Sequence, residues 1–208
     1  MPAANADKID LYKLNKAEYA APRKPKLIET KPAQYMVVEG RGAPGGEVFQ
    51  ARIEALYGMA YTAKFRSKFA GRDYTVCKLE GIYGIGGQSA ADFARLPPEE
   101  WKWKLLIRVP DFVGDEQLDE ARRTLRQRGK EGDFDDVHLE EIDEGRCVQM
   151  LHVGPYEEEQ RTVEAMKALA EDEGYELHMW HHEIYLSDPR RVPPDRLKTI
   201  LRHPVRKK

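Results

Sequence analysis

The feature that most restricts the fold is an order of segments that occurs twice along the chain. In residues 33–109, and again in residues 146–203, a strand-like run precedes a helical pattern and two more strand-like runs. Identity between the two halves is not obvious, so only the order is repeated. Because each segment has an apolar face that needs a partner, this order predicts an α+β fold. We expect two β-α-β-β modules with antiparallel sheets, helices on one face and a ligand cleft between the modules.

The first 30 residues are predicted to form an N-terminal arm, because Pro22 and Pro25 prevent a continuous helix there. Residues 31–208 then form one domain, whose modules span about residues 31–130 and 135–205. A chain of 208 residues is long enough for a single domain that encloses a pocket.

The clearest single pattern is an alternation of apolar and basic residues from Trp101 to Val109, which predicts a half-buried strand. Trp101 and Trp103 lie on its inward face and provide a large aromatic wall. Such a wall suits a hydrophobic core, and it also suits a pocket for a flat or cationic guest. Both interpretations remain open from the sequence.

Later segments are predicted from turn residues. Residues 137–142 and 146–153 flank Asp143-Glu144-Gly145 and are expected to form a β-hairpin. Gly154-Pro155 opens a helix whose first turn carries three glutamates, a placement that suits the helix dipole. Residues 198–205 are expected to form a last strand at an edge of the sheet.

One carboxylate stands in the middle of a strand-like run that ends at Asp188-Pro189. Alternation places Glu183 on one face with His181 and Tyr185, and it places His182 on the other face. If the first face lines a cavity, Glu183 is available as an acid, a base or a counter-charge for a cation. The alternative is an exposed glutamate on a solvated strand face, and the pattern does not separate the two.

Composition argues against several classes of protein. The formal net charge of −2 and the absence of a helix-turn-helix pattern do not favour a nucleic-acid-binding protein. No apolar run is long enough to span a bilayer, and two isolated cysteines without a signal peptide favour a cytoplasmic protein with reduced thiols.

No metal or other cofactor is expected from the histidine and cysteine spacing. His181 and His182 are adjacent on a strand and point to opposite faces, so they cannot chelate one ion together. His178 and His182 are separated by about 13 Å at the rise of a strand. Neither cysteine has a paired histidine in a motif, so no nucleophilic triad is indicated.

Several separated motifs stand out in the second half of the chain. They include Leu151-His-Val-Gly-Pro-Tyr156, the run from His181 through Glu183 to Arg191, and Lys198-Thr-Ile-Leu-Arg-His-Pro-Val205. Together they resemble the GyrI-like small-molecule-binding domain family. The match continues through residues 74–83 and 100–112, so it covers nearly everything after residue 30.

The resemblance implies the duplicated module fold, of the SHS2 type, with a ligand cleft between the modules. Stand-alone members similar to this chain are associated with hydrolysis of cytotoxic compounds that carry a cyclopropane ring. The family's glutamate corresponds to Glu183, and an acidic and an aromatic residue of the Leu-Glu-Gly segment correspond to Glu80 and Tyr83. The chain departs from many relatives, which have a Trp-Trp pair after Leu-Glu-Gly where this chain has Ile82-Tyr83. That departure leaves the shape of the guest open.

The leading hypothesis is therefore a cofactor-independent detoxifying hydrolase. Glu183 would activate a water that opens the ring, while Tyr83 or Tyr156 donates a hydrogen bond to the conjugated carbonyl. The residues expected to line the ligand site are Trp101, Trp103, Glu80, Tyr156, Tyr185, Tyr57 and His181.

The alternative is a multidrug-binding module that sequesters cationic or aromatic drugs without turnover, with Glu183 as the counter-charge. The small-molecule ligand is the only partner expected. An interaction with DNA gyrase, suggested by the family's name, is not supported by the modest net charge or by any long acidic run.

Overall fold

The structure is a computed structural model that describes residues 8–84 and 96–208. The first half contains a strand, a long helix and two strands, in the expected order. Its elements are β2 (Ala33–Arg41), α3 (Glu47–Phe69), β3 (Leu79–Tyr83), β4 (Lys102–Arg108), α5 (Asp115–Gln127) and β5 (His138–Ile142). The second half repeats that order with one additional short strand, β7 (Tyr175–Leu177), after the helix. Its other elements are β6 (Arg146–Val153), α6 (Glu159–Asp172), β8 (His181–Tyr185) and β9 (Lys198–Lys207).

The strands of both halves form one continuous antiparallel sheet in the order β1-β6-β9-β8-β3-β4-β2-β5, where β1 is Lys26–Glu29. The short strand β7 pairs with β9 beside this path. The two halves meet at the pairing of β3 with β8, where Gly81 lies directly opposite Glu183. The expected α+β architecture is confirmed, and its two halves are joined through the strand that carries Glu183.

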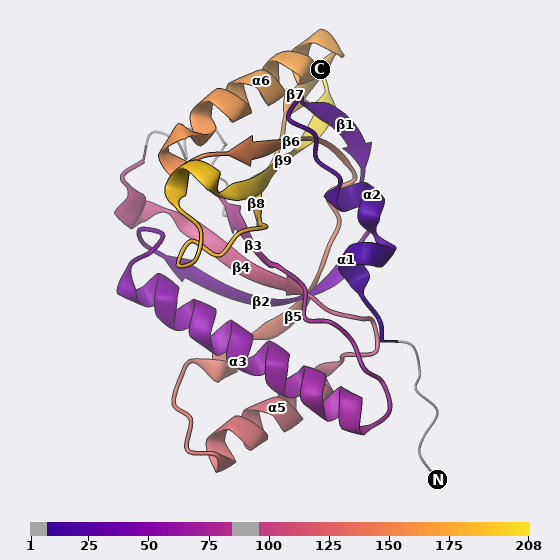
Figure 1. Cartoon of the computed structure of the whole chain (residues 1–208), viewed down its shortest axis with the longest axis vertical. Coiled ribbons are helices and arrows are strands. Elements are labelled where there is room, and N and C mark those ends of the chain that lie inside the picture. The colour runs from indigo at the N-terminus through magenta and orange to yellow at the C-terminus, as the bar shows by residue number, and fades with distance from the viewer. Residues whose placement is uncertain (1–7, 85–95) are drawn as a thin grey trace.

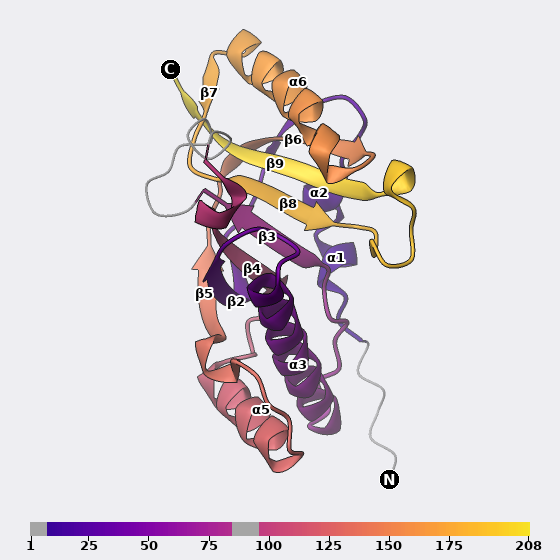
Figure 2. The same cartoon turned by 90° about the vertical axis from the view of Figure 1, so that its left-hand side faces the viewer.

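One face of the sheet, here called the helix face, packs against α3 and α6. Leu105, Gly81, Glu183 and Leu201 are register partners across four neighbouring strands, so their side chains share this face. Leu105 belongs to the core that includes residues of α3, and Leu201 belongs to the core under α6. In Figures 1 and 2, α6 lies at the upper end of the sheet, and α3 and α5 lie at the lower end.

The opposite face, here called the arm face, is partly covered by the N-terminal arm. The arm contains two short helices, α1 (Leu11–Leu14) and α2 (Lys16–Tyr19), followed by β1, which pairs with β6. Tyr19 packs with Ile184 and Ile200 of the arm face and is almost fully buried. The arm therefore contributes both a strand and core residues to the domain.

Two expectations about strand pairing are wrong. Residues 137–142 do not form a hairpin with residues 146–153, because β5 pairs with β2 of the first half and β6 pairs with β1 and β9. The last strand is not an edge strand, since β9 lies between β6 and β8 and most of it is buried. In both cases the partner strand comes from a distant part of the sequence, so local turn residues did not reveal it.

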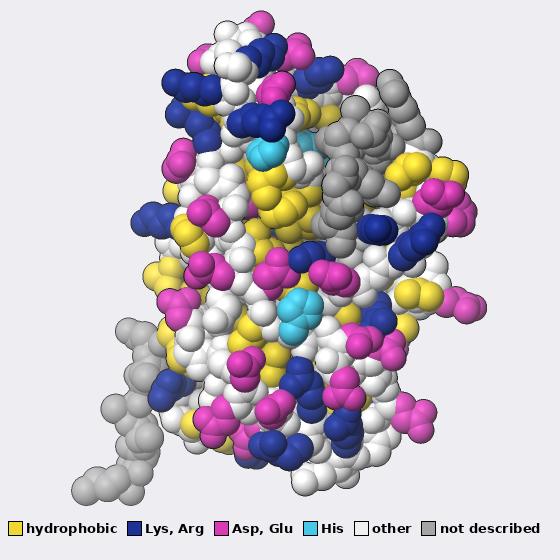
Figure 3. Space-filling view, turned by 180° about the vertical axis from the view of Figure 1, so that it is seen from behind, with side chains coloured by type: hydrophobic (Ala, Val, Ile, Leu, Met, Phe, Trp, Pro, Cys, Tyr) yellow, Lys and Arg dark blue, Asp and Glu magenta, His cyan; other side chains and the backbone are white. Residues whose placement is uncertain are grey.

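Within the described ranges, no helix combines the length and the apolarity needed to cross a membrane. Seen from behind, the molecule shows acidic and basic side chains interspersed over the surface, with hydrophobic side chains gathered near the centre (Figure 3).

Candidate active site

Glu183 lies at the middle of the sheet, on the helix face, where the two halves of the molecule meet. Its strand, β8, is paired on both sides, with Gly81 of β3 on one side and Leu201 of β9 on the other. The Glu183 side chain is only 13% exposed. The alternation in the sequence thus predicted that Glu183 shares a face with His181 and Tyr185, and packing has removed most of its contact with water.

Two histidines form a hydrogen-bonded pair that ends at Glu183. His181 Nε2 lies 3.2 Å from Glu183 Oε1, and His181 Nδ1 lies 2.8 Å from His203 Nε2. Burial, with a further contribution from His181, holds the pKa of His203 well below its usual range, so His203 is neutral. A His181 ring that donates from Nε2 to the Glu183 carboxylate can accept a hydrogen bond from His203 at Nδ1.

A second carboxyl group, that of Glu159, lies close to Glu183. Glu159 is the first residue of α6, and its Oε2 is 4.0 Å from His181 Nε2. The ligand atoms of Glu159, His181 and Glu183 all lie within 4.8 Å of one another. Glu159 is 8% exposed, and its Oε1 has no hydrogen-bond partner among the described residues. Burial, followed by the charge of Glu183 and a hydrogen bond with it, raises the pKa of Glu159 to about 10.

Three phenols surround this carboxyl pair. The hydroxyls of Tyr83 and Tyr185 are 2.5 Å apart, and the rings of Tyr156 and Tyr185 meet edge to face at 6.1 Å. Burial and the charge of Glu183 raise the pKa of Tyr83 and of Tyr185 well above the usual tyrosine value. The same two causes raise the pKa of Tyr156 to about 12. All three phenols therefore stay protonated at neutral pH and are available as hydrogen-bond donors.

Gly81 provides the space in which two of these phenols meet. A Cβ atom added at Gly81 would lie 2.9 Å from the Tyr185 hydroxyl oxygen and 3.1 Å from the Tyr83 ring. Pairing of β3 is regular across Gly81 on both sides, so the glycine does not mark a β-bulge. Because glycine has no side chain, Tyr83 and Tyr185 can lie over the backbone opposite Glu183.

No Lys or Arg side chain neutralises the two carboxyl groups in the part of the chain that the structure describes. Their only ion-pair partner there is His181. Every group that acts on the pKa of Glu159 raises it. Hydrogen bonds and aromatic rings of the described residues thus surround the pair of carboxyl groups in a mostly buried setting, and none of these residues adds a fixed cation.

Some residues expected at the ligand site lie elsewhere. Trp103 is fully buried, packs edge to face on Phe49 of α3, and donates its indole N–H to the carbonyl of Gly42, so it belongs to the core. Glu80 is fully buried on the arm face and bonds to His182 and Tyr19, so it lies on the opposite side of the sheet from Glu183.

The remaining two expected residues, Trp101 and Tyr57, lie against other aromatic rings. Trp101 is partly buried, and its ring meets that of Tyr83 edge to face at 6.3 Å. Tyr57 is on α3, stacks on Tyr61 and lies near Asp188, at the end of the Glu183 strand. The structure therefore brings together Glu183, His181, Tyr83, Tyr156 and Tyr185, with Trp101 beside Tyr83.

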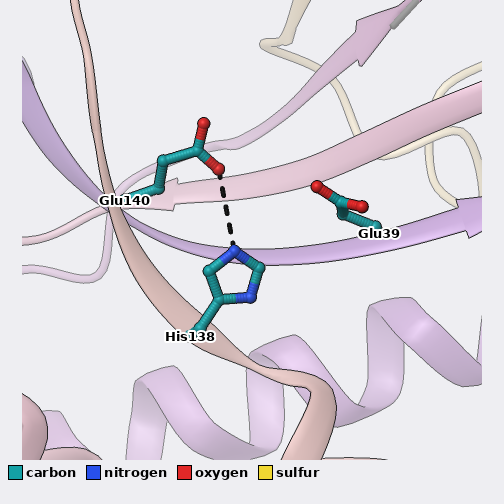
Figure 4. Close-up of side chains that lie close together, drawn as sticks. All are labelled: Glu39, His138 and Glu140. Atoms are coloured by element: carbon teal, nitrogen blue, oxygen red, sulfur yellow. Dashed lines mark ion pairs between the residues drawn. The ribbon is translucent and has the colours of Figure 1, made fainter. Parts of the chain in front are cut away.

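Among residues 8–84 and 96–208, two groups of side chains have ligand atoms close enough to hold a metal ion. One is Glu159, His181 and Glu183. The other is Glu39, His138 and Glu140 at the first half's end of the sheet, shown in Figure 4. In this second group Lys104 already contacts both carboxylates, at 3.2 Å and 2.7 Å, and the glutamates are partly exposed. A lysine ammonium thus supplies the positive charge there, and no such group stands between Glu159 and Glu183 among the described residues.

Sequence reasoning missed Glu159, which was interpreted only as one of three acidic residues in the first turn of a helix. Glu157 and Glu158 are exposed, as that interpretation requires, but Glu159 is buried. The helical periodicity contains a weak signal, since Glu159 lies four residues before the apolar Val163 on the packed side of α6. The partner strand that makes this position functional is more than 20 residues away in sequence.

Comparison with known proteins agrees with this architecture. Residues 124–206 match the family model of the GyrI-like small molecule binding domain. A Listeria innocua structure described as an uncharacterized conserved protein is 39% identical, with 96% of this chain and 100% of that chain covered and a TM-score of 0.86. A structure described as a hydrolase from Listeria innocua is 38% identical, with the same coverage and a TM-score of 0.85.

A more distant structure, the EcmrR C-terminal domain, has 12% identity and a TM-score of 0.59 over 89% of this chain and 98% of that chain, which shows a shared fold alone. A comparison with curated proteins found no match.

Proposed function

The chain belongs to the GyrI-like small-molecule-binding family, and from this premise we propose that it hydrolyses cytotoxic aromatic compounds that carry a cyclopropane ring. The observation that carries the proposal is a mostly buried glutamate among protonated phenols, with no Lys or Arg paired to it among the described residues. The name hydrolase given to the 38% identical Listeria innocua structure supports the same class of reaction.

The proposed reaction adds one water molecule across a strained carbon–carbon bond. Glu183 accepts a proton from the water while the water oxygen attacks a ring carbon. The cyclopropane C–C bond breaks, and its electron pair moves into the conjugated ring system, which becomes a phenolate. A phenol of the site donates a hydrogen bond to that oxygen as the negative charge develops. The phenolate then takes up one proton, so the product is the substrate plus water.

Accessibility distinguishes the two phenols that were considered as hydrogen-bond donors to the substrate. Tyr83 is 3% exposed, and its hydroxyl lies 2.5 Å from that of Tyr185. Tyr156 is 37% exposed and lies against Tyr185. We therefore assign substrate contact to Tyr156, while Tyr83 orients Tyr185 beside Glu183. Tyr156→Phe should lower turnover more than it lowers binding, because a developing charge gains more from a donor than a neutral carbonyl does.

The decisive experiment follows ring-opened product by mass spectrometry after incubation of the purified protein with a cyclopropane-bearing DNA alkylator. We expect catalytic turnover by the wild type and a decrease of about 10²- to 10⁴-fold in Glu183→Gln, the range for loss of a general base. Glu158→Gln, an exposed glutamate of the same region, is the matched control and should retain wild-type turnover. Stoichiometric binding without product would exclude the hydrolase.

A second candidate function is sequestration of cationic aromatic drugs without turnover. The absence of a fixed cation beside Glu159 and Glu183 within the described residues favours it, because a ligand ammonium would supply the missing charge. For a cation binder, Glu183→Gln should remove the preference for cationic over neutral ligands, and Glu183→Asp should keep part of it. A hydrolase should instead retain binding in Glu183→Gln and lose product formation.

A further inference from the structure

Glu159 has no role in the reaction described so far, yet it is a buried carboxyl group next to the proposed base. It lies on a different element, α6, and reaches the carboxyl group of β8 across the interface of helix and sheet. The exposed neighbours Glu157 and Glu158 do not share this environment. Its burial therefore results from its position against Glu183 rather than from the acidic composition of the helix start.

The position of Glu159 next to a second buried carboxyl group favours a protonated Glu159 side chain. Two ionised carboxylates within 4.8 Å of each other in a mostly buried site repel strongly unless a cation or a proton lies between them. The described residues place no Lys or Arg there, and His181 Nε2 is nearer to Glu183, at 3.2 Å, than to Glu159, at 4.0 Å.

The unpartnered Oε1 of Glu159 supports the same assignment. An ionised carboxylate only accepts hydrogen bonds, and no donor of the described residues reaches this atom. A protonated carboxyl group is a donor, and the Glu183 carboxylate is the acceptor beside it.

We propose that Glu159 is a positioning residue of the hydrolytic site, which stays protonated and donates a hydrogen bond to Glu183. This inference rests on the proposed function. The donated hydrogen bond holds one oxygen of Glu183, and the other oxygen faces the reacting water. One proton therefore occupies the carboxyl pair before the reaction. When Glu183 accepts the proton of the water the pair holds two, and it returns to one when a proton passes to the phenolate oxygen of the product.

The groups that face Glu159 come from three elements, and each is compatible with a proton on it. Glu183 and His181 lie on β8, Tyr83 lies on β3, and Glu157 and Tyr156 precede Glu159 in the chain. Behind His181 lies His203 of β9, which is neutral. None of these groups provides a permanent positive charge.

The test compares two substitutions of Glu159 that differ in one property. Glu159→Gln keeps a donor of similar shape that cannot ionise, and Glu159→Leu has no donor. We expect Glu159→Gln to retain turnover within about 10-fold of the wild type and Glu159→Leu to lose about 100-fold, the lower end for loss of proton-transfer assistance. The alkaline decrease of kcat/KM in the wild type should vanish in Glu159→Gln, because that side chain does not lose a proton. Glu158→Gln should retain the wild-type profile.

Two outcomes would overturn the assignment. Equal losses in the Gln and Leu variants would show that the donated hydrogen bond is not needed. A stoichiometric metal ion that remains with the purified protein, and whose removal by a chelator abolishes turnover, would place a cation rather than a proton between the carboxyl groups.

A spectroscopic measurement keeps this inference separate from the proposed reaction. Infrared spectroscopy at pH 8 should detect a protonated carboxyl band in the wild type that is absent in Glu159→Gln and present in Glu158→Gln. Absence of that band in the wild type would overturn the protonation of Glu159 even if the compound is hydrolysed. Presence of the band without turnover of any cyclopropane compound would reject the hydrolase and leave the shared proton established.

Discussion

The two faces of strand β8 carry similar residues, but their buried charges are neutralised in different ways. On the arm face, His182 lies 3.0 Å from Glu80 through one ring nitrogen and 3.0 Å from Glu144 through the other. Arg202 contacts Glu144 at 3.0 Å, and Arg108 contacts Glu18 at 2.8 Å. On the helix face, two carboxyl groups meet a histidine pair and phenols, with no Lys or Arg among the described residues.

The arm-face charges neutralise one another, whereas the helix-face carboxyl groups have no fixed counter-charge among the described residues. Burial alone would lower the pKa of His182, but the Glu144 and Glu80 carboxylates raise it to about 9, so His182 is a cation at neutral pH. Burial alone would raise the pKa of Glu144, but His182 and Arg202 hold it well below its usual range. The arm-face network is balanced, whereas the helix-face pair has no Lys or Arg partner among the described residues, and a ligand, a water or a proton can take that place.

The largest effect expected is on stability, from breaking the balanced network. Glu144→Ala removes a partner of His182, Arg202 and the Trp180 indole at once, so that Arg202 loses its carboxylate partner and His182 keeps only Glu80. We expect the free energy of unfolding to fall by about 3–5 kcal/mol in urea denaturation. Glu159→Gln, which removes no cation's partner, is the matched variant and should be at least as stable as the wild type. A loss under about 1 kcal/mol in Glu144→Ala would show that the arm-face network contributes little to the stability of the fold.

The two faces also differ in the pH range over which their groups affect stability. Glu159 has a folded pKa of about 10 against 4.5 for the free side chain, so its contribution is fully present below pH 4.5 and is lost as the pH rises toward 10. The contribution of His182 is fully present below pH 6.5 and is lost as the pH rises through 9. Between pH 5 and 6.5, therefore, Glu159 makes the free energy of unfolding depend on pH, whereas His182 does not.

We expect the free energy of unfolding to fall in that window by up to about 1.4 kcal/mol per pH unit in the wild type, and this slope to be smaller in Glu159→Gln. Chemical denaturation at a series of pH values measures both slopes. Identical slopes in the two proteins between pH 5 and 6.5 would contradict a protonated Glu159.

A smaller effect is expected from filling the space opposite Glu183. Gly81→Ala would bring a methyl group to 2.9 Å from the Tyr185 hydroxyl, so Tyr185 and Tyr83 must move. We expect kcat/KM to fall about 10-fold, which corresponds to about 1.4 kcal/mol, because the phenols leave their positions beside Glu183. The unfolding curve and the steady-state kinetics should be measured together. Unchanged kinetics with an intact fold would show that the phenol positions do not matter for turnover.

The smallest effect is expected at the exposed cluster of Glu39, His138 and Glu140. Glu140→Gln weakens its contact with Lys104, which still lies 3.2 Å from Glu39. A surface ion pair contributes at most about 1 kcal/mol, so we expect a change under about 0.5 kcal/mol in the free energy of unfolding and no change in turnover. A larger loss of stability or activity would mean that this cluster is not a simple surface network.

The sequence predicted much of the fold from periodicity. The repeated order of a strand-like run, a helical pattern and two strand-like runs is present in both halves, and the alternation from Trp101 corresponds to β4. Alternation also placed His181, Glu183 and Tyr185 on one face of β8. The hairpin of residues 137–153 and the edge position of the last strand were wrong, because pairing partners depend on contacts between distant segments.

The candidate site was only partly predictable for the same reason. A strand pattern gives the face on which a side chain lies, but it does not tell which helix covers that face. Trp103 and Glu80 carried suitable chemistry, and packing placed the first in the core and the second on the arm face. Glu159 carried only the weak periodic signal of its spacing from Val163, and packing placed it beside Glu183.

The sequence by itself determined the elements, their repeated order, the family resemblance and the face on which Glu183 lies. These properties follow from local periodicity and from motifs, which are present in the order of residues. Tertiary structure alone decided that Glu183 meets Glu159, and that His182, one residue away, meets Glu80 and Glu144 instead. Adjacent strand residues point into opposite environments, and the charge that surrounds each depends on segments that folding brings from elsewhere in the chain.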